Sequence, residues 1–244
     1  MDLGIRGKKA LVTGGTRGIG RAAALMLAQE GCDVAVAARG VDLPLQEALR
    51  AHGVEAYSLS WDALELQGAA LMIGWIRERW AQIDILVNNV GGGGRWGQNF
   101  DNTPDRVWEE VMTKNFWAAR DCTRLVLPMM KEQCWGRIVT VSSMHGREGA
   151  PNVKPWFMAA KAAEIALMKA MAQDETLHTF GITFNTVAPG YILAGANYPP
   201  LSQSPHRVGT PEDVASLVTF LCSKQARFIN GACMAIDGGE GRAL

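Results

Sequence analysis

The amino-acid sequence lacks an excess of either charge, a long apolar run and a signal peptide. Lysine and arginine number 24 and aspartate and glutamate 24, so the formal net charge is zero. A neutral chain gives no reason to expect nucleic acid or an anionic membrane as a partner. No apolar stretch is long enough to span a bilayer, and the start, MDLGIRGKK, is polar. We therefore predict a cytoplasmic protein that binds neither nucleic acid nor membrane.

Cysteine is scarce and scattered. Cys32, Cys122, Cys134, Cys222 and Cys233 are odd in number and show no C-x-x-C spacing. This pattern is typical of reduced thiols in a cytosolic protein, most of them small core fillers. Nothing in the spacing supports a catalytic thiol, and we assign no metal site.

Apolar strand-like runs alternate with helical segments along the whole chain. The runs are continuous, as in strands covered on both faces, and occupy residues 8–13, 33–38, 55–62, 83–89, 136–143, 181–190 and 231–237. Helical patterns occupy residues 18–29, 43–52, 64–80, 155–177 and 210–223. Thr103 and Pro104 open another long helix, with threonine predicted as its N-cap.

This order predicts an α/β protein that forms one domain over residues 1–244. Its architecture would be a Rossmann-type, doubly wound parallel sheet of about seven strands with helices on both faces. Residues 191–208 form the longest stretch without clear periodicity, which predicts a substrate lid.

The first predicted strand runs into a glycine-rich turn, Thr13-Gly14-Gly15-Thr16-Arg17-Gly18-Ile19-Gly20. Glycines at such a turn let the backbone approach a pyrophosphate, and the next helix presents unpaired N–H groups to it. The turn follows a strand and opens a helix, which is the context that gives the pattern its meaning. The spacing T-G-x-x-x-G-x-G resembles that of the short-chain dehydrogenase/reductase family.

The resemblance extends over essentially the whole chain and implies specific roles. Asn88-Asn89-Val90-Gly91 is similar to the N-N-A-G element of the family, and Asn115, Ser143 and Lys161 match its catalytic positions in order. Asn115 would hold a water in a proton relay, Ser143 would bind the substrate oxygen, and Lys161 would bind the nicotinamide ribose. The resemblance implies cofactor contacts from Gly14, Thr16, Arg17, Gly18, Ile19, Gly20, Arg39, Asp62, Asn89, Gly91, Lys161, Pro189 and Gly190. It also implies a homo-dimer or homo-tetramer and a small-molecule substrate.

The choice of cofactor follows from the end of the second strand. An NAD site places an acid there to bind the ribose 2′-hydroxyl, but this strand ends Ala37-Ala38-Arg39. Arg17 projects from the glycine turn toward the same region. Two guanidinium groups and no carboxylate suit a 2′-phosphate, so we expect NADP(H) in preference to NAD(H).

At the position of the family motif Tyr-x-x-x-Lys, this sequence has Phe157-Met158-Ala159-Ala160-Lys161. The family tyrosine protonates a carbonyl oxygen as hydride reaches the carbon, and a phenyl ring has no hydroxyl for this step. No tyrosine lies between residues 150 and 160. The candidates for a replacement proton donor are His145, Tyr191, Tyr198, Ser143 and a water bound to Lys161.

The substitution leaves several functions open. The chain is interpreted as an NADP(H)-dependent oxidoreductase that acts on a small carbonyl, alcohol or enone with a substituted proton donor. Alternatives are a non-redox enzyme on the same scaffold, such as a dehydratase, cyclase or isomerase, and a cofactor-binding protein without turnover. A further alternative is a parent carbonyl reductase inactivated by an engineered tyrosine-to-phenylalanine change.

Overall fold

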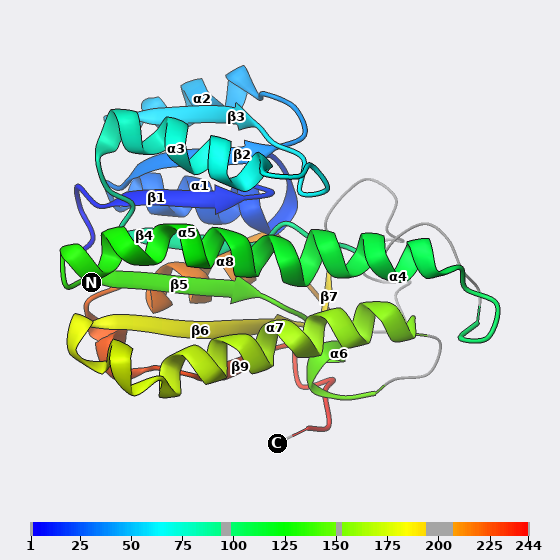
Figure 1. Cartoon of the computed structure of the whole chain (residues 1–244). Coiled ribbons are helices and arrows are strands. Elements are labelled where there is room, and N and C mark those ends of the chain that lie inside the picture. The colour runs from blue at the N-terminus through cyan, green and yellow to red at the C-terminus, as the bar shows by residue number, and fades with distance from the viewer. Residues whose placement is uncertain (1, 94–98, 150–152, 194–206, 244) are drawn as a thin grey trace.

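The structure is a computed structural model, and it describes residues 2–93, 99–149, 153–193 and 207–243. Tyr198 and most of the predicted lid lie outside the described residues. Within them the core is one parallel sheet of seven strands in the order β3-β2-β1-β4-β5-β6-β9 (Figure 1). The strands are β1 Lys9–Thr13, β2 Asp33–Ala38, β3 Ala56–Ser60, β4 Ile85–Asn88, β5 Gly136–Val141, β6 Ile182–Pro189 and β9 Cys233–Ile236. The predicted fold class is confirmed.

Helices cover both faces of the sheet because successive strand residues point to opposite sides. In β1, Ala10 and Val12 pack into one core cluster, and Leu11 packs into the other. The helices on the first face are α1 Gly18–Gln29, α2 Leu43–Arg50 and α8 Pro211–Leu221. Those on the second face are α3 Gly68–Trp80, α5 Ala118–Glu132 and α7 Pro155–Gln173. This is the predicted doubly wound arrangement.

The strand order reverses between β1 and β4. The chain moves outward from β1 through β2 to β3, and β4 then returns to the other side of β1. In open parallel sheets, ligands bind at such a switch point, outside the carboxyl ends of the strands. In Figure 1 the arrows end toward the right, so this edge, called the carboxyl edge below, is where the site is expected.

The long helix predicted from Thr103 begins later and is interrupted. Helix α4 spans Asp105–Met112, and its N-cap is Pro104. The Thr103 hydroxyl donates to the carbonyl of Asn99 (2.5 Å), so the prediction of a threonine cap was wrong. A π-helical turn, η1 Thr113–Trp117, separates α4 from α5. An i→i+5 turn of this kind is frequent at functional sites.

Two other predicted helix boundaries were wrong. Helix α3 starts at Gly68 rather than at residue 64, because Gln67 adopts a left-handed backbone (φ 63°). Helix α7 stops at Gln173, where Asp174 accepts the Thr176 N–H and opens the 3₁₀ turn η2 Glu175–Phe180.

Several short elements were not predicted. They are α6 Met144–Arg147, the 3₁₀ turn η4 Gln225–Phe228, and the paired strands β7 Tyr191–Ile192 and β8 Val208–Gly209. Among the described residues, no helix combines the length and apolar character needed to cross a membrane.

The N-terminus of α8 allows the contribution of a helix cap to stability to be tested. Thr210 accepts from the Asp213 N–H, and Asp213 accepts from the Thr210 N–H, which completes a capping box. Replacing a capping threonine with alanine costs about 1 kcal/mol. We expect Thr210→Ala to lower the free energy of unfolding by that amount in urea titrations. The control, Ser216→Ala in the middle of the same helix, should change it by less than half as much.

Candidate functional site

The glycine turn after β1 is held by a side-chain amide and by close approach of the backbone. Gly14 has a positive φ (64°), and the Asn89 side-chain amide donates to the carbonyls of Thr13 (3.0 Å) and Gly14 (3.1 Å). A Cβ placed on Gly20 would lie 2.4 Å from both the Gly14 oxygen and Asn89 Nδ2. Only glycine at residue 20 therefore lets α1 start this close to the strand.

The first turn of α1 is open to an anion. Its N-cap, Arg17, makes no side-chain capping bond, and no acid lies in the first turn. The N–H groups of a helix start and the positive end of its dipole favour phosphate. The chemistry and the close backbone approach therefore fit the pyrophosphate of a dinucleotide.

Thr13 joins this turn to the end of β4. Its hydroxyl donates to the Val87 carbonyl (3.3 Å) and accepts the N–H groups of Asn89 (3.0 Å) and Val90 (3.2 Å). Asn89, predicted to lie beside the adenosine ribose, thus has its side chain on the glycine turn. The structure gives it a turn-holding contact that the sequence did not predict.

Asn115 and Lys161 meet beside the loop after β4. Asn115 Oδ1 accepts the Gly92 N–H (3.0 Å), and its amide donates to Gly92 O (3.1 Å) and Val111 O (2.7 Å). A Cβ on Gly91 would lie 2.4 Å from Asn115 Oδ1 and 3.2 Å from Lys161 Nζ. The structure therefore brings Asn115, Lys161 and Gly91 together.

Two neighbouring serines fix the end of β5. Ser143 is buried and caps α6 by accepting the His145 N–H (3.2 Å). Ser142 donates its hydroxyl to the Lys161 carbonyl (2.8 Å), which ties α7 to the strand. Ser143 therefore lies at the carboxyl edge, close to the segment that carries Lys161.

Phe157 faces this group from α7. Its ring centroid lies 6.0 Å from Lys161 Nζ, and ring atoms come within 3.8 Å of where a Gly93 Cβ would be. The preceding residue, Trp156, is fully buried and donates its indole N–H to Gly93 O (2.9 Å). The unusual Lys-Pro-Trp run thus starts α7 and anchors it to the loop after β4.

Lys161 has a partner that the sequence analysis missed. Its ammonium donates to Val141 O (2.9 Å) and to both carboxylate oxygens of Glu164 (3.2 and 3.0 Å). Both side chains are buried, at 6% and 2% exposure. Burial raises the pKa of Glu164 to about 7, against the lowering effect of Lys161. The available signal was an acid one turn after the lysine, in the otherwise apolar run AAEIALM.

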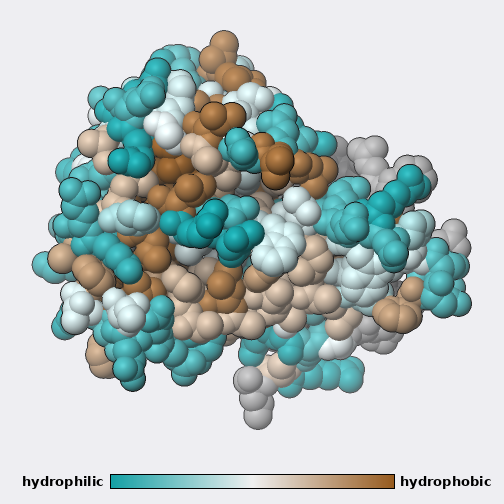
Figure 2. Space-filling view, viewed as in Figure 1, coloured by the Kyte–Doolittle hydropathy of each residue, from teal (hydrophilic) through white to brown (hydrophobic). Residues whose placement is uncertain are grey.

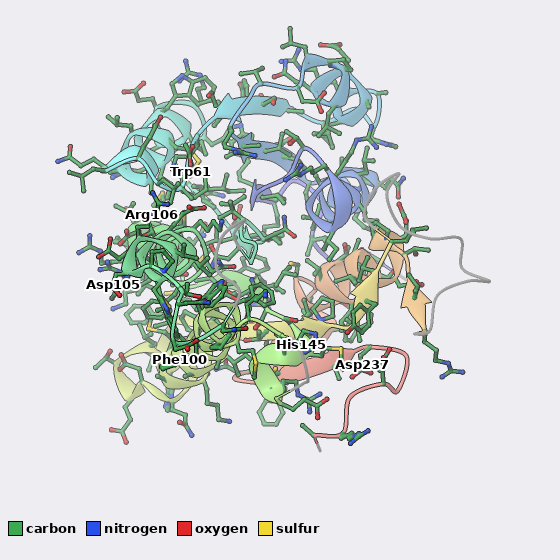
Figure 3. The ribbon with its side chains drawn as sticks, turned by 90° about the vertical axis from the view of Figure 1, so that its right-hand side faces the viewer. Trp61, Phe100, Asp105, Arg106, His145 and Asp237 are labelled. Carbon is green, nitrogen blue, oxygen red and sulfur yellow. The ribbon has the colours of Figure 1, made fainter. Side chains whose placement is uncertain are left out.

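His145 and Tyr191 lie together on the other flank, with ring centroids 6.1 Å apart. Burial lowers the pKa of His145, opposed by Glu148 and Glu240, and its Nδ1 has no hydrogen-bond partner among the described residues. Figure 3 looks onto the carboxyl edge and places His145 near Asp237. Tyr57, on β3, packs instead against Trp75 and Trp80 of α3.

A hollow of about 510 Å³ adjoins the Tyr191 flank. Gly190, at the end of β6, approaches Asp237 so closely that a Cβ would lie 2.8 Å from its Cα. The hollow is lined by Tyr191, Ile192, Arg207, Val208, Gly209, Asp213, Ser216, Ile236, Asp237 and Gly238. A hollow of about 560 Å³ at Asp2, Gly4, Arg6 and Glu30 lies away from this edge and from every predicted site residue.

At the opposite end of the edge, Arg39 follows β2 and Arg17 starts α1, and both are exposed. Within the described residues neither guanidinium forms an ion pair. Asp62 follows β3 and accepts the Leu64 N–H (3.0 Å). The neighbouring Trp61 appears in the upper half of Figure 3, away from His145.

Comparison with known proteins agrees with this geometry. The profile described as Enoyl-(Acyl carrier protein) reductase matches residues 14–240. The 3-oxoacyl-(acyl-carrier-protein) reductase of Staphylococcus aureus is 34% identical, over 95% of this chain and 97% of its own. The chain belongs to the short-chain dehydrogenase/reductase family.

Solved structures of the family superpose closely. Acetoin dehydrogenase from Salmonella typhimurium has a TM-score of 0.86 at 31% identity, covering 98% of this chain and 97% of its own. A xylitol dehydrogenase with bound NAD⁺ has a TM-score of 0.85 at 28% identity, covering 96% and 99%. The names of these relatives are those of oxidoreductases.

The buried cysteines do not form a second reactive site. All are free, and burial raises the pKa of Cys32 and Cys122 to about 12. Buried thiols with a raised pKa are poor nucleophiles. No cluster of three metal-ligating side chains occurs within the described ranges.

The raised pKa of Glu164 predicts a pH-dependent stability. The folded state binds this proton more tightly than the unfolded chain, whose glutamate titrates near its usual pKa of ~4.3. The stabilisation is complete below that lower pKa and is lost as pH rises through about 7. Between about pH 5 and pH 8, the free energy of unfolding of the parent should fall relative to Glu164→Gln, by on the order of 3 kcal/mol.

Denaturant titrations at a series of pH values measure this difference. Glu110→Gln is the matched control, since Glu110 pairs with Lys114 at a more exposed position. Its difference from the parent should stay level over the same range. A level difference for Glu164→Gln would contradict the raised pKa.

Proposed function

We propose that this protein is an NADP(H)-dependent oxidoreductase that acts on a small carbonyl, alcohol or enone and uses a substituted proton donor. The observation that carries the proposal is that two groups of residues lie at the carboxyl edge of the sheet. The open start of α1 lies beside the glycine turn, and Asn115, Ser143 and Lys161 gather around the ends of β4 and β5.

The preference for NADP(H) rests on Arg17 and Arg39. Planar guanidinium groups bind phosphate through paired hydrogen bonds, and no acid lies at the end of β2 to bind a 2′-hydroxyl. The bound cofactor would supply or accept hydride. The glycine turn, Arg17, Arg39, Asp62 and the Pro189-Gly190 turn would hold it.

The chain's own residues would orient the substrate and manage the proton. Ser143 has a hydroxyl at the carboxyl edge and would donate to the substrate oxygen. Phe157 would shape the pocket and has no proton to give. The titratable residues that would replace the tyrosine are His145, whose backbone N–H binds the Ser143 hydroxyl, and Tyr191, whose ring adjoins that of His145. An activated carbonyl or enone needs less help from an acid, which fits this loss.

Assembly into a homo-oligomer belongs to the same proposal. Val107, Val111 and Met168 are buried within the chain itself, so they are not available to a second copy. Apolar side chains nevertheless reach the surface over α3 and near the start of α5 (Figure 2), where Leu71 of α3 and Trp117 of η1 are exposed. Free, mostly buried cysteines fit a reducing, cytoplasmic location.

The cofactor preference is tested by two substitutions. A charge-assisted hydrogen bond contributes about 1.5–3 kcal/mol, or about a 10- to 100-fold change in Kd. We expect Arg39→Ala and Arg17→Ala each to weaken NADPH binding by about that factor in fluorescence titrations. Binding of NADH should change by less than about twofold. Arg21→Ala, also exposed on α1, is the control, and tighter binding of NADH than NADPH by the parent would refute the preference.

The proton-donor hypothesis is tested by Phe157→Tyr. A positioned acid–base group contributes about 10²–10⁴-fold to a rate. We expect NADPH-dependent reduction of simple ketones to rise by about tenfold or more, measured at the nicotinamide absorbance band. No gain would mean that the pocket is built for another reaction. Substrate turnover by the parent without a change at that band would favour the non-redox alternative.

A further inference from the structure

We propose that Glu164 is a positioning residue that cancels the charge of Lys161, so that the site around position 157 carries no net positive field. The absence of the tyrosine hydroxyl and the presence of Glu164 are therefore two parts of one change in the site. A phenol placed at position 157 would still be able to donate a proton, but it would gain little acidity from Lys161 while Glu164 is present. The inference rests on the proposed function only in placing position 157 at the reacting centre.

The hydrogen-bond count supports this role. An ammonium has three N–H donors. Three oxygens lie within 3.2 Å of Lys161 Nζ, namely Val141 O and the two carboxylate oxygens of Glu164. These acceptors match the donors in number, so Lys161 can bind a ribose hydroxyl only by giving up one of them. Glu164 therefore fixes the position of Lys161 Nζ as well as balancing its charge.

The charge balance leads to the same conclusion. The carboxylate and the ammonium are one helical turn apart on α7 and are both buried. Once Glu164 has released its proton to the solvent, one proton remains between the amine of Lys161 and the carboxylate of Glu164. The pair then has zero net charge, whichever of the two groups holds that proton. An unpaired ammonium about 6 Å from an aromatic ring would lower the pKa of a phenol there by about one to two units. The paired ammonium lacks most of that effect.

Other charges do not replace Glu164. Within the described ranges, Lys161 is the one charged group that moves the pKa of Glu164. The ionisable groups on elements packed against α7 are His145 and Arg147 on α6, Asp105, Arg106, Glu109 and Glu110 on α4, Lys114 on η1, Glu175 and His178 on η2, and Arg137 on β5. Lys114 is paired with Glu110, and the Arg137 guanidinium bonds to carbonyls of Gly136, Gly181 and Ser223.

The test is a phenol titration in full-length protein. Phenolate absorbance is followed with pH in Phe157→Tyr and in the double variant Phe157→Tyr/Glu164→Gln, and the parent curve is subtracted to remove the three native tyrosines. The introduced phenol should titrate near the ordinary value of ~10 in the single variant. In the double variant its pKa should be lower by about one to two units.

The matched control is Phe157→Tyr/Glu110→Gln, which removes one carboxylate from an ion pair on the neighbouring helix. It should titrate like Phe157→Tyr. If Glu164→Gln fails to fold, as judged by circular dichroism, Glu164→Leu takes its place. Equal phenol pKa values with and without Glu164, or an equal shift in the control, would overturn the inference.

Activity separates this inference from the proposed function. If both hold, the double variant should reduce ketones with NADPH about tenfold faster than the single variant at about pH 8.5, where Glu164 is ionised, because a phenol with a lower pKa is a better proton donor. A lowered phenol pKa without ketone reduction in any variant would leave the role of Glu164 standing and would count against the proposed function.

Discussion

The buried ammonium of Lys161 is the constraint on which the rest of the site depends. A charge taken out of water must be paired and hydrogen-bonded, because burying it alone costs on the order of several kcal/mol of stability. Here the strand β5 supplies a carbonyl and α7 supplies a carboxylate, and both must be in place. The helix is fixed accordingly, by the Ser142 hydroxyl on the Lys161 carbonyl and by the Trp156 indole on Gly93.

The two halves of the carboxyl edge are built by different means. On the dinucleotide side, the Asn89 side-chain amide holds the backbone of the turn, and the close approach depends on the absence of side chains at Gly14 and Gly20. On the other side, polar side chains of α7, η1 and the end of β5 bond to backbone atoms and to the buried carboxylate of Glu164. Since the two halves share few atoms, the second can change while the first is kept. The combination of a complete glycine turn with Phe157 and Glu164 is consistent with such a change.

The sequence predicted best those features that local chemistry decides. Thr210-Pro-Glu-Asp213 forms the capping box that its spacing indicates, because all of its partners lie within one turn. Thr103-Pro104 has a similar pattern, yet Thr103 bonds backward to Asn99 and the helix starts at Asp105. The π-helical turn at Asn115 also has no local signal that we recognised. Its side chain bonds to Gly92, which is distant in sequence, and that contact exists only in the folded chain.

The sequence by itself determined the α/β sheet with two covered faces, the glycine turn, the set of Asn115, Ser143 and Lys161, and the missing hydroxyl at Phe157. The positions of strands and helices along the chain, their apolar faces and the glycine turn follow from periodicity and backbone sterics, which are local properties. Tertiary structure alone decided that Glu164 is buried against Lys161 and that His145 meets Tyr191. A glutamate one turn after a lysine is a weak surface pair in most helices. Packing of α7 against the sheet removes the water, and removal of water makes this pair govern the charge of the site.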